Sequence, residues 1–272
     1  MSPLITLEAL AAARDALVID CRFSLTDSEA GRRGYAVGHI PGARYADLER
    51  DLSGPREPGG AGGRHPLPDR EALCERLRSW GVDNRSSVVC YDQNSGAVAG
   101  RLWWLMRWLG HADVRVLDGG LDAWIAAGFE TETAEPAPAR GNFEARLPLT
   151  RTRTADDLPD SDIELLDARD AARFRGESEP FDPVAGHIPG AICAPFTENL
   201  EAGRFKSADQ LERRFLELGV DPARDTVCYC GSGVTATHNV LALLIAGFPE
   251  PALYAGSWSD WISDADRPIA TG

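Results

Sequence analysis

The residues most suited to chemistry form one short loop late in the chain. It reads Cys230-Gly231-Ser232-Gly233-Val234-Thr235. The run DTVCYC at 225–230 predicts a strand that ends on the cysteine, and ATHNVLALLIAGF at 236–248 predicts a helix after the loop. Backbone N–H groups curled inward at such a turn, with the positive end of the helix dipole, favour a thiolate over a thiol. Because the thiolate is the nucleophilic form, Cys230 is a candidate nucleophile, and the glycines give the loop the backbone freedom to turn.

The elements that must position this loop occur twice. The motif GHIPGA is found at 38–43 and again at 186–191. Around each copy, short apolar runs alternate with helical patterns, which predicts an α/β fold with a parallel sheet in each half. A single repeat of this length indicates two domains, because solenoid repeats are much shorter. We expect an N-terminal, non-catalytic domain at 1–130, a linker rich in Ala, Pro and charge at 131–150, and a C-terminal catalytic domain at 151–272.

The repeat separates a catalytic from a structural cysteine. Asp92 stands in the first copy where Cys230 stands in the second, whereas Cys90 matches Cys228. A cysteine at a strand end is by itself more often a small buried hydrophobe. Since the fold does not need a cysteine at position 230, and ligands of open α/β sheets bind beyond the carboxyl ends of the strands, we interpret Cys230 as the nucleophile and Cys228 as packing.

With these motifs, the chain resembles the tandem-domain sulfurtransferases of the rhodanese family over essentially its full length. The resemblance rests on DCR and DAR before the two GHIPGA motifs, on the loop 230–235, and on GSWSDW at 256–261. It implies two rhodanese-like domains, each a parallel-sheet core flanked by helices. It also implies that a small anionic donor gives a sulfane sulfur to Cys230 as a persulfide, which a thiol, a thioredoxin-like protein or cyanide then removes.

The same resemblance implies roles for further residues. Within the family, a CGSGVT loop resembles that of 3-mercaptopyruvate sulfurtransferases, whereas thiosulfate-preferring members carry basic residues there. Ser232 and an acidic residue of the first domain, matched here by Glu49, would assist proton movement. His65 is the nearest match to a substrate-side histidine, and Arg173 to the first arginine of a carboxylate clamp. Gly231, Gly233, Val234 and Thr235 would line the substrate as the loop backbone.

Several alternatives remain open at the level of sequence. The donor could be thiosulfate, or the chain could be a persulfide carrier that acts with partner proteins. His65 could be an ordinary loop histidine, and Arg173 could make a surface ion pair with the acidic stretch 177–179. The second clamp arginine would fall near Asp182, so Arg64 or Arg175 would have to replace it. A cysteine phosphatase is disfavoured, because the loop contains no Arg or Lys to hold phosphate.

Composition narrows the class of partner. The chain has 28 basic and 42 acidic residues, a formal net charge of −14, which disfavours nucleic acid and anionic membrane surfaces. No apolar run approaches the roughly 18 residues of a membrane span, and the N-terminus lacks a signal-peptide pattern, so we expect a cytoplasmic protein. The six cysteines include no C-x-x-C pair. We therefore expect neither a metal site nor a cofactor.

Overall fold

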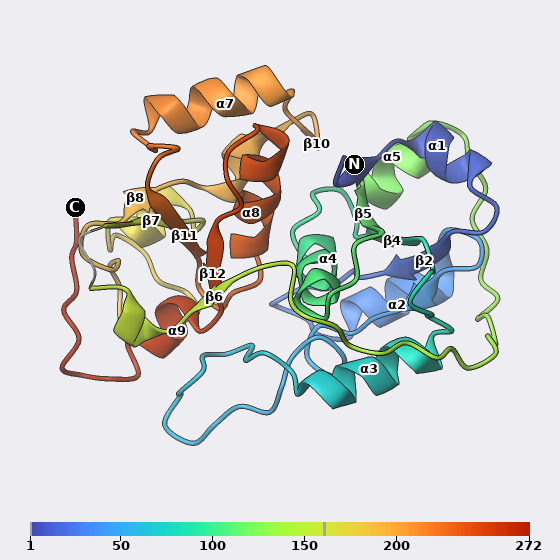
Figure 1. Ribbon diagram of the computed structural model, residues 1–272, viewed down its shortest axis with the longest axis horizontal. Helices are drawn as coiled ribbons and strands as arrows, with labels where there is room; N and C mark the ends of the chain where they lie inside the picture. The colour runs from blue at the N-terminus through green and yellow to red at the C-terminus, as the bar shows by residue number, and fades with distance from the viewer. Residues whose placement is uncertain (1, 160–161) are drawn as a thin grey trace. The chain divides into compact units, whose positions relative to one another are not determined.

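The computed structural model describes residues 2–159 and 162–272 and divides into two compact units. Unit 1 comprises the chain up to Gly54 and Pro68–Leu149, and unit 2 comprises Pro55–Leu67 and Thr150–Gly272. Figure 1 shows each unit as strands flanked by helices. The predicted α/β class with two similar halves is confirmed.

Unit 1 is built on a five-stranded parallel sheet in the order β1-β5-β4-β2-β3. Its strands are β1 (Leu4–Ile5), β2 (Leu17–Asp20), β3 (Arg44–Tyr45), β4 (Val88–Tyr91) and β5 (Val114–Leu117). Its helices are α1 (Leu7–Ala12), α2 (Ala30–Val37), α3 (Arg70–Ser79), α4 (Ala99–Trp108) and α5 (Gly120–Ala126). All four residues of β2 and of β4 are buried, as is typical of central strands covered on both faces.

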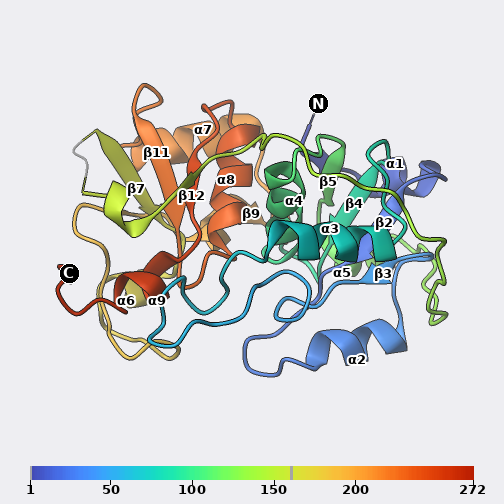
Figure 2. The same ribbon diagram turned by 60° about the horizontal axis from the view of Figure 1, so that its bottom comes forward.

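Unit 2 repeats this topology in the order β6-β12-β11-β7-β8, again with parallel strands. Its strands are β6 (Thr152–Arg153), β7 (Ile163–Asp167), β8 (Ile192–Cys193), β11 (Asp225–Tyr229) and β12 (Ala252–Tyr254), with a hairpin of β9 (Leu200–Glu201) and β10 (Arg204–Phe205). Its helices are α6 (Ala171–Phe174), α7 (Ala208–Glu217), α8 (Ala236–Ile245) and α9 (Ser257–Trp261), with 3-10 turns η1 (Ala155–Asp157) and η2 (Phe196–Asn199). Figure 2 shows α8 beside β11 and β12, against which it packs.

Local sequence explains where the elements begin and end. Ser207 caps α7 and forms a capping box with Gln210, each side chain accepting the other residue's backbone N–H. Leu211 and Phe215, one turn apart, are the buried face of that helix. Gly219 then stops it with φ of 86°.

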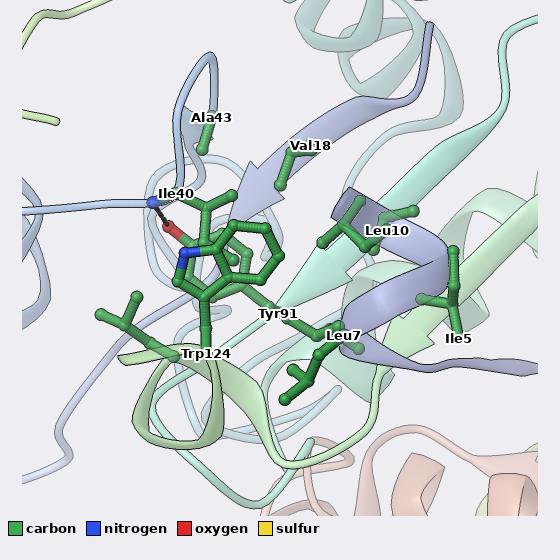
Figure 3. Packing of buried hydrophobic residues seen from close by; sticks show 11 residues of the cluster. Ile5, Leu7, Leu10, Val18, Ile40, Ala43, Tyr91 and Trp124 are labelled. Atoms are coloured by element: carbon green, nitrogen blue, oxygen red, sulfur yellow. Dashed lines mark hydrogen bonds between the residues drawn. The ribbon is translucent and has the colours of Figure 1, made fainter. Parts of the chain in front are cut away.

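The repeated motifs hold each sheet to its first crossover. In unit 1 the Arg22 guanidinium binds Asp20 at the end of β2 and donates to the Gly38 carbonyl at 2.8 Å. The hydroxyl of Tyr91 accepts the Ile40 N–H, and Figure 3 shows this bond inside the apolar cluster around Trp124. The matching groups of unit 2 repeat the arrangement: Arg169 binds Asp167 and the Gly186 carbonyl, and Tyr229 accepts the Ile188 N–H. Motifs with the same contacts in both copies are structural.

Two segments pack in a way that periodicity does not reveal. The stretch expected as linker runs along unit 1, where Phe143 is buried and its N–H donates to the Val82 carbonyl at 3.1 Å. Residues 55–67 belong to unit 2 although both chain segments around them belong to unit 1. No helix in the described ranges combines the length and apolar character needed to cross a bilayer.

Candidate active site

Cys230 directly follows β11 and begins the loop that leads into α8. Cys230 is 2% exposed and is therefore almost completely enclosed. Cys228, two residues earlier, is completely enclosed in the sheet. Burial, and secondarily the charge on Cys230, raises the pKa of Cys228, which keeps it a protonated thiol at neutral pH. These environments agree with the assignment of Cys228 to packing.

The start of α9 holds the cysteine loop in place. The Oγ of Ser257 accepts the Cys230 N–H at 3.0 Å and donates to the Tyr254 carbonyl at 3.0 Å. The N–H of Trp258 donates to the Cys230 carbonyl at 2.9 Å, and that of Ser259 to the Gly231 carbonyl at 3.0 Å. The GSWSDW motif therefore fixes the backbone of Cys230 and Gly231.

Ser257 adopts a backbone conformation that favours glycine. Its φ is 55°, and the equivalent residue of unit 1 is Gly120, with φ of 57°. The two units share the surrounding hydrogen bonds, since the N–H of Leu121 donates to the Asp92 carbonyl at 3.0 Å. Sequence reasoning missed Ser257, although its alignment with a glycine in the repeat was a usable signal.

The loop of unit 1 shows what such a backbone can hold. The Asp92 carboxylate accepts backbone N–H groups from Ser95, Gly96, Val98 and Ala99, at 3.2, 2.9, 2.9 and 3.2 Å. A strand-to-helix turn in this fold thus forms a nest of N–H groups around an anion. The cysteine loop is one residue shorter, from Cys230 to Ala236 rather than from Asp92 to Ala99.

Ser232 is joined to His65, which the segment 55–67 brings into unit 2. The Nδ1 of His65 and the Oγ of Ser232 are hydrogen bonded at 2.8 Å, and both residues are buried. The segment is anchored on α9, because the N–H of Gly62 donates to Asp260 at 2.7 Å. Gly63 has φ of 80°, and a Cβ there would lie 2.3 Å from the Gly256 carbonyl oxygen. A glycine is therefore required where the segment crosses α9.

Two arginines lie against the loop at Gly231. A Cβ built on Gly231 would be 3.0 Å from an Arg64 Nη2 and 3.2 Å from the Arg173 Nη2. Both guanidinium groups bind the buried carboxylate of Asp182, Arg173 at 3.2 Å. Arg173 also pairs with Glu179 at 2.8 Å, and this pair is buried rather than on the surface. Of the two substitutes considered for a clamp arginine, Arg64 lies at the loop.

The other predicted residues are Arg175, three further residues of the loop, and Glu49. Arg175 pairs with Glu177 at 2.7 Å, and both side chains are exposed. Gly233 has φ of 73° and approaches the Ala255 carbonyl too closely for any side chain, whereas Val234 is buried and Thr235 precedes α8. Glu49 belongs to unit 1, where it is exposed in the turn after β3 and its N–H donates to Asp47 at 2.9 Å.

Within 2–159 and 162–272, no group of three or more His, Cys, Asp or Glu side chains could hold a metal ion. The side chains gathered at the candidate site supply a thiol, a hydroxyl, an imidazole and two guanidinium groups. This set is suited to nucleophilic chemistry on a small anion.

Comparisons with known proteins agree with the resemblance seen in the sequence. The family model of the rhodanese-like domain matches residues 5–127 and 150–264. A Pseudomonas aeruginosa protein named as a probable 3-mercaptopyruvate sulfurtransferase is 53% identical over 265 residues, covering 95% of this chain and 93% of the relative. The thiosulfate sulfurtransferase of Gallus gallus is 34% identical, with 91% and 86% covered. The crystal structure of SseA from Escherichia coli, described as a rhodanese fold of the 3-mercaptopyruvate sulfotransferases, has a TM-score of 0.84 at 31% identity, with 95% and 99% covered.

Proposed function

Because the chain belongs to the rhodanese family and consists of two rhodanese-like domains, we propose that it is a sulfurtransferase that carries sulfur on Cys230. One observation carries this proposal most directly. The two units place equivalent loops at equivalent strand ends, and a thiol replaces the anion of Asp92 in unit 2 alone. The thiol of Cys230 thus stands at the strand end where unit 1 has a carboxylate.

The first step transfers sulfur from donor to enzyme. The Cys230 thiolate attacks the sulfur of 3-mercaptopyruvate, and an S–S bond forms. The donor C–S bond breaks, its electron pair stays on the departing carbon as pyruvate enolate, and protonation of that carbon gives pyruvate. Cys230 remains as a persulfide, whose negative charge the loop N–H groups stabilise.

The second step returns the enzyme to its starting state. A thiol, a thioredoxin-like protein or cyanide attacks the outer sulfur of the persulfide. The S–S bond breaks, its electron pair returns to Cys230 as the thiolate, and the acceptor leaves with the sulfur. Each step uses only the protein and its two substrates, and we propose that it takes place in the cytoplasm.

The remaining candidate residues support these steps. Ser232, hydrogen bonded to His65 at 2.8 Å, supplies the proton route to the departing enolate, with Glu49 as the acidic member on the resemblance alone. Arg173 binds the donor carboxylate, since a guanidinium can hold a carboxylate by two parallel hydrogen bonds. We propose 3-mercaptopyruvate as the preferred donor, because the loop itself carries no cation for the dianion thiosulfate.

The test replaces the two neighbouring cysteines separately. Cys230→Ser should abolish transfer from both donors, because a serine hydroxyl cannot form a persulfide. Cys228→Ala should keep most of the activity, since its thiol is buried and protonated. Mass spectrometry after donor addition without acceptor should find one added sulfur on the peptide containing Cys230. Wild-type turnover by Cys230→Ser would contradict the proposal.

A further inference from the structure

Asp182 is shared by the two guanidinium groups that touch the cysteine loop. One carboxylate oxygen binds Arg64, and the other lies 3.2 Å from Arg173. The Asp182 side chain is 3% exposed, whereas those of Arg64 and Arg173 are 20% and 11% exposed. The anion is therefore more enclosed than the two cations that it binds.

Both guanidinium groups lie close to the cysteine loop. Their Nη2 atoms lie 3.0 and 3.2 Å from the position of a Cβ on Gly231, the residue that follows the nucleophile. Phe181 supports them from one side, with its ring centroid 6.0 Å from the Arg64 Cζ and 5.1 Å from that of Arg173. A charge held at this distance acts on any anion that reaches Cys230, because Coulomb interactions over a few ångströms in a partly buried site are strong.

The charges in this cluster cancel. Arg64, Arg173 and Arg169, which also pairs with Glu179, contribute three positive charges, and Asp182, Glu179 and Asp167 contribute three negative ones. A donor therefore meets two arginines that can donate hydrogen bonds, but little net positive field. In such a site the arginines can still bind one donor carboxylate through hydrogen bonds. A second negative charge on the donor adds little binding energy, because the net positive charge is small.

We propose that Asp182 is a specificity-determining residue that lowers the net positive charge of the pair Arg64 and Arg173 and so selects donors with one negative charge over dianions. This inference rests on the proposed sulfur transfer at Cys230. It assigns the choice of donor to a residue outside the loop 230–235. It also explains how two arginines can lie at the loop without making the site one for thiosulfate.

The experiment compares Asp182→Asn with Glu177→Gln. Both remove one negative charge, but Glu177 pairs with Arg175 on the surface. With thiosulfate and 3-mercaptopyruvate measured side by side, Asp182→Asn should raise the ratio of their kcat/KM values about tenfold toward thiosulfate. The shift should shrink as ionic strength rises. Glu177→Gln should leave the ratio within about twofold of wild type.

A second variant pair keeps the test decisive if Asp182→Asn folds poorly. Arg64→Gln removes one cation and should move the ratio the other way, toward 3-mercaptopyruvate. The double variant Arg64→Gln/Asp182→Asn restores the charge balance and should return the ratio toward wild type. An unchanged ratio in Asp182→Asn, or in Arg64→Gln where that is the variant that folds, would overturn the inference.

The outcomes distinguish this inference from the proposed function. If Cys230→Ser is inactive while the Asp182 and Arg64 variants keep the wild-type ratio, sulfur transfer stands and only the role of Asp182 fails. If Cys230→Ser is active, the proposed function itself fails.

Discussion

At the scale of the residue, burial decides which thiol can react. Burial raises the pKa of Cys21, Cys74, Cys193 and Cys228. A raised pKa keeps each of these thiols protonated, and thus weakly nucleophilic, until the pH rises well above neutral. The local environment of each cysteine should therefore decide which of them reacts in the native protein.

This gives a labelling prediction at pH 7–8. Iodoacetate, a small anion like the proposed donor, should alkylate Cys230 first, because the loop is built to admit such a molecule. Peptide mapping by mass spectrometry after short exposure measures the site. Cys230→Ser should remove the fast phase, and excess 3-mercaptopyruvate should slow it in wild type. Fast modification of Cys193, the half-buried alternative, would contradict the prediction.

At the scale of the element, α9 acts on the chemistry through the loop backbone. Ser257 keeps a left-handed φ of 55° and uses its Oγ to accept the Cys230 N–H, whereas unit 1 has Gly120 at the same place. A non-glycine residue in that conformation costs on the order of 1 kcal/mol. The hydrogen bond to the nucleophile's own peptide is the contact that unit 1 cannot make with a glycine.

Ser257→Gly tests this role because it relieves the backbone strain and removes the side chain whose Oγ accepts the Cys230 N–H. We expect kcat to fall about tenfold while KM changes little, since the sulfur is misplaced but the arginines remain. Ser257→Ala should lose the same activity and about 1–2 kcal/mol of stability, because the buried Cys230 N–H loses its acceptor. Ser257→Gly should be more stable than Ser257→Ala, because glycine adopts this φ without strain. Kinetics and urea unfolding measure the two effects. Full activity of Ser257→Gly would mean that α9 does not position the cysteine.

The sequence predicted the sheets and proposed Cys230, His65 and Arg64 as site residues, but it did not predict the contacts that bring these residues together. Buried runs such as VVCY and DTVCY predict strands by composition alone, and the repeat singles out Cys230. Arg64 and His65 reach the loop through a segment whose path depends on the close contact of Gly63 with Gly256. Asp182 pairs with Arg64 across more than a hundred residues. Such long-range contacts leave no periodic signal in one sequence.

At the scale of the whole molecule, one fold occurs twice with divided roles. Unit 1 keeps the strand order, the GHIPGA contacts and the anion nest, but fills the nest with its own Asp92. Unit 2 keeps the equivalent loop for Cys230 and receives the segment 55–67 with His65 and Arg64. The proposed function assigns the reaction to unit 2 alone, and this assignment can be tested through Asp92.

Asp92→Ala should destabilise the loop of unit 1 and leave the chemistry of Cys230 intact. The change removes the carboxylate that accepts four backbone N–H groups, those of Ser95, Gly96, Val98 and Ala99. Losing these bonds should cost about 2–4 kcal/mol locally. Hydrogen exchange should therefore rise in the peptide from Ser95 through α4, while exchange in α8 stays at the wild-type rate. Asp92→Asn keeps one acceptor oxygen, so its hydrogen exchange in this peptide should lie between that of the wild type and that of Asp92→Ala. Turnover per folded molecule should remain within about twofold of wild type, because the persulfide forms on the other loop. Lost turnover with unchanged exchange in α4 would instead give Asp92 a part in the reaction, and the assignment of unit 1 as the non-catalytic copy would be wrong.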